Sequence, residues 1–313
     1  MKKLLSIAIA AAVAAPMAVS ADTTIYGLID NALTHNDNGT TDAWDIEKGN
    51  GTSRLGVKGS EDLGNGMKAI FQYEWATETT EGGSTSLGFT NRLGFVGLTG
   101  GFGTVAIGRQ WTPYYGAVAK TNIMNAPSAG FRQTLNSYRT GNALAYVTPN
   151  MNGFSASLAF VIDNSGADAE DGVDGTSLAL KYDNGPLSVG LGYNAFEANS
   201  ATNATVNDNE TLGLSGKYNF GNFAIVGAYE DRDFGAADQE AWQLGAEAYF
   251  GNNTARILIG EIDNDAAADT DAWAVGLEHS FSKRTRVYAE YASQDTTGGV
   301  DVSEFALGLR HDF

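Results

Sequence analysis

The sequence predicts an all-β protein, a transmembrane antiparallel β-barrel of about 16 strands. First, segments of about ten residues alternate between apolar and polar side chains along the chain. Second, turn-forming glycine is abundant, with 39 Gly against 5 Pro in 313 residues. Third, very short turns alternate with longer polar segments, which predicts short periplasmic turns at one end and long extracellular loops at the other. A soluble β-sandwich needs far fewer strands.

The amino terminus predicts an export signal. Lys2 and Lys3 precede an apolar stretch over residues 4–15, and small residues follow up to Ala21. The stretch is shorter than the ~20 residues that a membrane-spanning helix needs. We therefore expect residues 1–21 to be a signal peptide and residues 22–313 to form a single barrel domain.

The first strand after this signal shows the alternation clearly. Ile25 and Ile29 lie on one face, and Tyr26 and Asp30 lie on the other. Glycine and asparagine punctuate the chain because they tolerate the positive φ of tight hairpin turns. We expect short turns at residues 61–66, 99–101, 149–153, 183–186, 220–222, 251–253 and 282–283. We expect longer loops at residues 35–50, 78–87, 113–140, 163–173, 199–207, 232–238, 264–270 and 295–301.

Phenylalanines gather at the predicted short turns, where an aromatic girdle at a lipid–water interface would lie. The alternative is ordinary packing at the ends of hairpins. The residues concerned are Phe102, Phe154, Phe220, Phe223, Phe250 and Phe281.

Charge and residue spacing exclude several classes of function. The chain has 37 acidic and 19 basic residues, for a net charge of -18, which disfavours nucleic acid as a partner. There is no cysteine, and no serine or histidine spacing typical of a hydrolase or a zinc site. Acidic clusters at residues 168–174 and 263–271 fit divalent cations, bound directly or through lipopolysaccharide, but a solvated acidic surface fits better. We expect no enzyme activity, no cofactor and no metal site.

Long ordered motifs give the chain a family resemblance. The stretches are TTIYGLIDNAL (23–33), SRLGVKGSEDLGNGMKAIFQYEW (53–75), NRLGFVGLTGGFGTVAIGRQWTP (91–113), YRTGNALAYVTPNMNGFSASLAF (138–160) and FALGLRHDF (305–313). With them the chain resembles the general porins of Gram-negative outer membranes. The resemblance implies a homotrimer in outer-membrane lipid and lipopolysaccharide, passing ions and small hydrophilic solutes by passive diffusion. It also implies a third loop, residues 113–137, that folds into the lumen.

Three arginines in three predicted strands are candidates for the pore constriction. Arg54 lies on the face opposite Leu55, and Arg92 lies opposite Leu93 and Phe95. An arginine facing hydrocarbon at mid-depth costs several kcal/mol, so these faces should be lumenal. By motif, Arg54, Arg92 and Arg139 match the basic cluster of such porins. The alternative is that each pairs singly with a wall carboxylate such as Asp30 or Glu74.

The predicted third loop departs from the resemblance in its charge. Many porins of this type carry acidic residues there, but residues 111–140 contain no Asp or Glu, and they contain Lys120 and Arg132. A narrow passage lined by Arg54, Arg92, Arg139 and Lys120 predicts a weak preference for anions. Two other interpretations stay open: a channel specific for one sugar, phosphate or other anion, and an adhesin or structural barrel without conductance.

The resemblance also marks residues for assembly. By alternation, Arg109 lies on the same face of its strand as Val105 and Ile107, which is the face opposite the lumen. In the family, a residue at this place meets the second loop of a neighbouring subunit, so Glu78 and Glu81 are candidate partners in a trimer. The alternative is a locally paired arginine. The terminal Phe313 resembles the assembly signal of outer-membrane barrels.

Overall fold

The computed structural model describes residues 22–81, 88–126, 139–162, 172–197, 209–235, 237–265 and 267–313. The predicted signal peptide lies outside these residues and stays a prediction. The first strands are β1 (Asp22–Asp37), β2 (Asp42–Lys48), β3 (Arg54–Gly64), β4 (Met67–Thr77), β5 (Phe89–Gly100), β6 (Gly103–Trp111), β7 (Arg139–Val147) and β8 (Phe154–Val161). The others are β9 (Gly175–Asn184), β10 (Leu187–Phe196), β11 (Asn209–Asn219), β12 (Phe223–Asp233), β13 (Asp238–Phe250), β14 (Asn253–Asn264), β15 (Thr270–Ser280), β16 (Thr285–Thr296) and β17 (Val302–Asp312).

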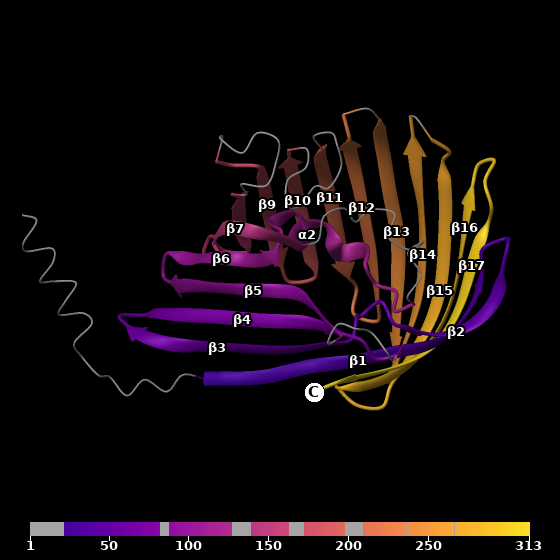
Figure 1. The fold of residues 1–313 in the computed structure, drawn as a ribbon, viewed down its shortest axis with the longest axis horizontal. Coiled ribbons are helices and arrows are strands. Elements are labelled where there is room, and N and C mark those ends of the chain that lie inside the picture. Colours follow the sequence, from indigo (N-terminus) through magenta and orange to yellow (C-terminus); the bar gives the residue numbers. More distant parts are fainter. Residues whose placement is uncertain are drawn as a thin grey trace, which may run out of the picture.

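The strands close into one antiparallel barrel (Figure 1). Strand β1 pairs with β17 on one side, which joins the two ends of the chain. On its other side, residues 22–28 of β1 pair with β3 and residues 31–37 pair with β2. Because β2 and β3 together occupy one position, the 17 assigned strands make a 16-strand barrel. The predicted fold class is confirmed.

The loop predictions are wrong in part. Most of residues 35–50 is strand, because β1 continues to Asp37 and β2 begins at Asp42. The later long loops shrink to residues 234–237, 265–269 and 297–301. At residues 35–37, 230–233 and 293–296 both faces of the strands carry polar side chains, so alternation no longer marks where a strand ends.

Outward and inward faces follow the period of two. In β11, Leu212 and Leu214 point outward with 49% and 51% of their surface exposed, as lipid contact requires. Thr211 and Ser215 point into the lumen and are buried. The six turn phenylalanines are also exposed, as a girdle at the membrane interface requires.

The short turns contain the residues that their backbone requires. Asn65 and Gly66 between β3 and β4 have φ of 52° and 75°, and Asn152 and Gly153 between β7 and β8 have φ of 55° and 96°. Non-glycine residues seldom adopt this left-handed region, but asparagine tolerates it. These two turn predictions are confirmed.

The wall is interrupted between β2 and β3. Residues 49–53 lie opposite only Ile29 and Asp30 of β1, since Leu28 pairs with Arg54 and Asn31 pairs with Lys48. The Asp30 carboxylate accepts a hydrogen bond from the Gly51 backbone N–H at 3.1 Å. We call residues 49–53 the β2–β3 bulge.

The third loop enters the lumen after β6. It forms α2 (Pro113–Val118) and the 3-10 turn η1 (Ala119–Thr121), and Figure 1 shows α2 inside the curve of the strands. Helix α2 lies against glycines of β10 and β11. A Cβ on Gly190 would lie 2.4 Å from the Ala117 carbonyl oxygen, so the loop can approach only a glycine here. Among the residues that the structure describes, no helix is long and apolar enough to cross a membrane.

The loop then crosses toward the other side of the barrel. Met124 and Ala126 are buried against lumen-facing side chains of β1 and β14–β17, including Ala32 and Tyr288. The remaining loop residues, 127–138, lie outside the described part of the chain. Residues 113–126 therefore lie between two opposite parts of the wall.

Candidate pore constriction

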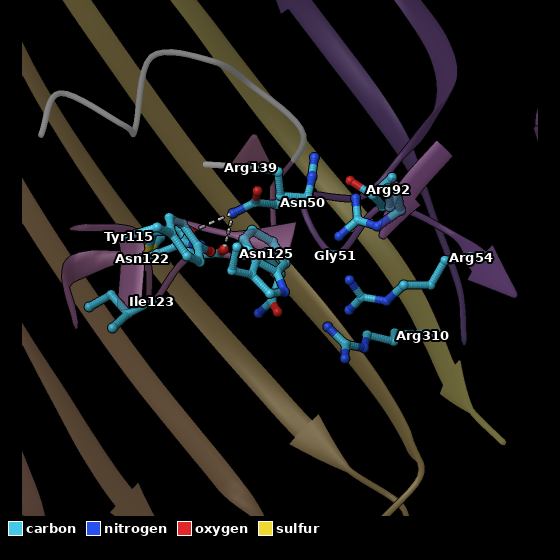
Figure 2. Close-up of a pocket in the computed structure, with 13 residues that line it drawn as sticks. Asn50, Gly51, Arg54, Arg92, Tyr115, Asn122, Ile123, Asn125, Arg139 and Arg310 are labelled. Atoms are coloured by element: carbon cyan, nitrogen blue, oxygen red, sulfur yellow. Dashed lines mark hydrogen bonds between the residues drawn. The ribbon is translucent and has the colours of Figure 1, made fainter. Parts of the chain in front are cut away.

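Four arginines from four strands line one cavity in the lumen. The cavity has a volume of about 380 Å³, and Arg54 (β3), Arg92 (β5), Arg139 (β7) and Arg310 (β17) all border it. Figure 2 shows Arg54, Arg92 and Arg310 on one side and the loop residue Ile123 on the other. We call this space the arginine cavity and these four side chains the arginine wall.

Arg92 reaches the cavity because of a β-bulge. Glu74 pairs with Leu93 and Trp75 pairs with Asn91, so Arg92 is an extra residue in β5. Alternation predicts Leu93 on the outer face, and this prediction is wrong: Leu93 is buried and lines the lumen next to Glu74. The bulge turns Arg92 to the same side, where its Nε donates to Glu74 Oε1 at 2.6 Å.

Arg139 is placed by a second bulge, on β7. Gly108 pairs with Ala143 and Gln110 pairs with Thr140, which leaves one extra residue on β7. Asn142, inside this bulge, has a φ of 49°. Beyond it, Arg139 pairs with Trp111, and its guanidinium lies over the indole ring at 4.6 Å.

Carboxylates compensate the arginine wall only in part. Glu74 serves two arginines, because Arg54 Nη1 lies 3.8 Å from the Oε1 that also accepts from Arg92. Arg310 pairs with Asp312 at 2.8 Å. Among the described residues, no carboxylate forms an ion pair with Arg139, and its buried Nε makes no hydrogen bond. The wall therefore carries excess positive charge.

The opposite side of the cavity carries no charged side chain among the described residues. It is formed by loop residues 122–125, and the β2–β3 bulge holds them in place. The backbone N–H of Asn50 donates to the Asn125 carbonyl at 2.9 Å. The Asn50 side-chain amide donates to Asn122 Oδ1 at 3.0 Å and to the Met124 carbonyl at 2.7 Å (Figure 2).

A group of carboxylates lies behind the loop, on the far part of the wall. We call Glu247 (β13), Glu278 (β15) and Glu290 (β16) the acidic wall. Glu290 accepts three hydrogen bonds from the loop: from the backbone N–H groups of Asn125 at 2.8 Å and Ala126 at 2.6 Å, and from the Asn125 amide at 3.0 Å. The loop thus covers this carboxylate and fixes itself to it.

All three carboxylates of the acidic wall have a cationic partner in Arg256, which lies 3.1 Å from Glu278, 3.4 Å from Glu247 and 4.0 Å from Glu290. Lys217 adds a contact of 2.5 Å to Glu247. Negative charge on this wall is therefore compensated locally.

Lys120 and Arg109 do not line the arginine cavity. The Lys120 ammonium donates to the Ala117 carbonyl at 3.2 Å, so the structure does not bring it to the other cations. Arg109 has a buried Nε that makes no hydrogen bond to any residue that the structure describes. Arg132 lies outside the described residues.

The two candidate loop carboxylates differ. Glu78 forms an ion pair with Lys48 of its own chain at 2.7 Å. This contact and the backbone N–H groups of Thr80 and Glu81 lower the pKa of Glu78 to about 2. Glu81 is exposed, and no ion pair of its carboxylate occurs with the described residues.

Sequence reasoning missed Arg310 as a cavity residue. Alternation along β17 predicts that Arg310 faces the lumen, because Ala306, Gly308 and Arg310 share one face of the strand. Its distance along the chain from the other arginines hid the connection, which comes from the pairing of β1 with β17.

Phe313 lies at the seam where the barrel closes. Its backbone exchanges two hydrogen bonds with Gly27, at 3.0 and 3.2 Å. Its ring occupies the space that a Cβ on Gly27 would fill, 2.5 Å away.

Among the described residues, no group of three or more His, Asp or Glu side chains could hold a metal ion. Part of the acidic cluster at residues 168–174 lies outside the described residues.

Comparison with known proteins identifies the family. A family model described as Gram-negative porin matches residues 7–299. Outer membrane porin protein 32 of Delftia acidovorans is 30% identical, over 100% of this chain and 99% of the relative. The anion-selective porin from Comamonas acidovorans is similar in structure, with a TM-score of 0.80, 25% identity, and coverage of 94% of this chain and 100% of that chain. Salmonella typhi OmpF shares the fold, with a TM-score of 0.74, 16% identity, and coverage of 93% and 97%. The chain belongs to the family of Gram-negative porins.

Proposed function

We propose that this porin prefers anions and that the arginine wall sets the preference. As a porin, the chain forms an outer-membrane channel for the passive diffusion of ions and small hydrophilic solutes. The observation that carries the proposal is the charge around the arginine cavity. Arg139 lacks a carboxylate partner among the described residues, and the facing loop residues 122–125 are uncharged.

The net charge of the whole chain opposes this preference but acts from farther away. Exposed charges separated by more than a Debye length, ~8 Å at physiological ionic strength, are largely screened. Charges that line a narrow, partly desolvated passage are screened much less. The arginine wall therefore outweighs the acidic loops. The anion selectivity of the similar Comamonas porin supports the same sign.

The test removes two charges from the arginine wall. In planar bilayers, Arg92→Ser combined with Arg139→Ser should raise conductance by widening the passage and should move the reversal potential toward cations. A control with the same change in charge, Lys58→Ser with Lys68→Ser, removes two lysines outside the cavity and should shift the potential much less. Equal shifts in the two double variants would contradict the proposal.

The same recordings test the alternative of a ligand-specific channel. A specific channel would saturate with one sugar or anion, and that solute would block the small-ion current. A porin with general anion preference should conduct chloride in proportion to its concentration. Lys120 stays outside this proposal because its ammonium lies away from the cavity.

We also infer a homotrimer in which Arg109 meets Glu81 of a neighbouring subunit. Arg109 has no ion pair with the described residues of its own chain, and Glu81 is exposed, whereas Glu78 is already held by Lys48. Arg109→Glu should weaken the heat-resistant oligomer, and adding Glu81→Arg should restore it. A double variant as weak as the single one would rule this contact out.

For Phe313 we propose a role in assembly that exceeds its contact with Gly27. Phe313→Ala keeps the backbone hydrogen bonds to Gly27 and loses only the ring. The variant should yield much less heat-resistant oligomer in cells but should still refold in detergent. Wild-type amounts in cells would refute the role.

A further inference from the structure

Two aromatic rings form a stack beside the arginine cavity. Trp111 ends β6 and Tyr115 lies in α2, with ring centroids 4.5 Å apart and planes inclined by 13°. The Tyr115 backbone N–H donates to Oγ1 of Thr112, which caps α2, at 3.1 Å. This cap fixes the turn from strand to helix so that Tyr115 folds back over Trp111.

The indole of Trp111 also contacts two cations of the arginine wall. The Cζ atom of Arg139 lies 4.6 Å from the ring centroid, and that of Arg92 lies 5.8 Å away. Tyr115 covers one face of the indole too closely for a guanidinium to fit there. The two guanidiniums therefore use the other side, within the ~6 Å over which an aromatic face attracts a cation.

These contacts hold two like charges close together. Arg92 and Arg139 repel each other, and of the two only Arg92 has a carboxylate partner, Glu74, among the described residues. A second carboxylate would hold Arg139 but would cancel its charge. An aromatic ring attracts a cation through its quadrupole and carries no net charge. It can therefore hold two guanidiniums together and leave their positive potential in the passage.

We propose that Trp111, braced by Tyr115, is a positioning residue for ion selectivity. It keeps the guanidiniums of Arg139 and Arg92 directed at the cavity without neutralising them. The inference rests on the proposed anion preference. It explains why the strand that leads into the loop ends in an aromatic residue beside like charges.

The test compares two replacements of Trp111. Trp111→Leu removes the aromatic face, and the permeability ratio of chloride to potassium should fall at least about twofold, a change that matches a cation–π contact. Trp111→Phe keeps an aromatic face and should retain most of the ratio. Trp273→Leu is the matched control, because Trp273 is exposed on the outer face and contacts Tyr291 instead of an arginine. It should leave the ratio unchanged.

A second background separates positioning from a change in pore shape. Adding Trp111→Leu to the Arg92→Ser, Arg139→Ser double variant should not change the permeability ratio further. The triple variant should therefore have the same ratio as the double variant. A further fall of the same size would show that Trp111 acts without the arginines, and would overturn the inference. Tyr115→Leu keeps Trp111 and removes its brace. It should give a smaller fall in the ratio and more current noise, and it carries the test if Trp111→Leu does not fold.

The outcomes distinguish this inference from the proposed function. A wild-type channel without anion preference overturns both. An anion-selective wild type whose ratio is unchanged by Trp111→Leu overturns only the role of Trp111. Equal falls in Trp111→Phe and Trp111→Leu also overturn it, because then bulk rather than the aromatic face is what matters.

Discussion

The arginine wall and the acidic wall face each other across the same loop but differ in how their charge is compensated. On the acidic wall, Glu290 binds the loop itself, and Arg256 and Lys217 serve Glu278 and Glu247. On the arginine wall, one carboxylate, Glu74, serves two arginines. The loop turns the donors of Asn125 and Ala126 to the acidic wall, and its described residues present no charged side chain to the cavity. The sign of the field therefore depends on which charges stay uncompensated, and the net charge of the chain does not decide it.

The largest expected effect comes from breaking the acidic wall where it holds the loop. Glu290→Ala leaves two backbone N–H groups of the loop, those of Asn125 and Ala126, without their acceptor, while the Asn125 amide keeps its hydrogen bond to Glu278 at 3.1 Å. Each buried donor left unsatisfied costs ~1–3 kcal/mol, so we expect a loss of about 3 kcal/mol in unfolding free energy. Thermal unfolding in detergent measures it, and bilayer recordings should show unsteady conductance.

The matched variant is Glu290→Gln, which keeps one acceptor oxygen and should lose about half as much. If Glu290→Ala unfolds like the wild type and conducts steadily, the loop is held by other contacts. Its packing on the glycines of β10 and β11 would then be the main anchor.

A smaller effect comes from neutralising one carboxylate on each wall. Glu74→Gln removes the negative charge nearest Arg92 and Arg54, so anion preference should rise about twofold. Glu247→Gln makes the same change in charge on the acidic wall, where Lys217 and Arg256 lie close to it. Its effect on the reversal potential should be clearly smaller. A larger shift in Glu247→Gln than in Glu74→Gln would reverse the roles given to the two walls.

How far the sequence predicted these walls depends on the kind of feature. Strands and hairpin turns followed from alternation and from Asn–Gly pairs, as at Asn65 and Gly66. The entry of the third loop into the lumen came from the family resemblance. The bulges at Arg92 and Asn142 were not predictable, because one inserted residue changes parity without any mark in the local pattern. The position of the Lys120 ammonium at the Ala117 carbonyl was also not predictable, since alternation gives no direction for a side chain inside a folded loop.

The smallest expected effect concerns the second loop, where Glu78 does not line the arginine cavity. The pKa of Glu78 is lowered from 4.5 to about 2, chiefly by Lys48. A lowered pKa means that the ionised form supports the ordered loop. The support is complete above pH 4.5, weakens below it, and is lost as the pH falls through about 2.

Titration of Glu78 measured by NMR or infrared spectroscopy checks this prediction. Lys48→Met removes the main cause and should return the pKa of Glu78 toward its ordinary value. An unchanged pKa in the variant would assign the shift to the backbone N–H groups of Thr80 and Glu81 instead. Oligomer formation and selectivity near neutral pH should not change.

The most direct test of the central claim is the reversal potential of the wild-type channel in a tenfold KCl gradient. Because the arginine wall has excess positive charge, we expect a reversal potential with the sign that a chloride-selective channel gives. The potential should weaken as the mean salt concentration rises and screening increases. A reversal potential with the sign that a potassium-selective channel gives, at any salt concentration, would show that the acidic residues control permeation. The arginine wall would then have no role in selectivity.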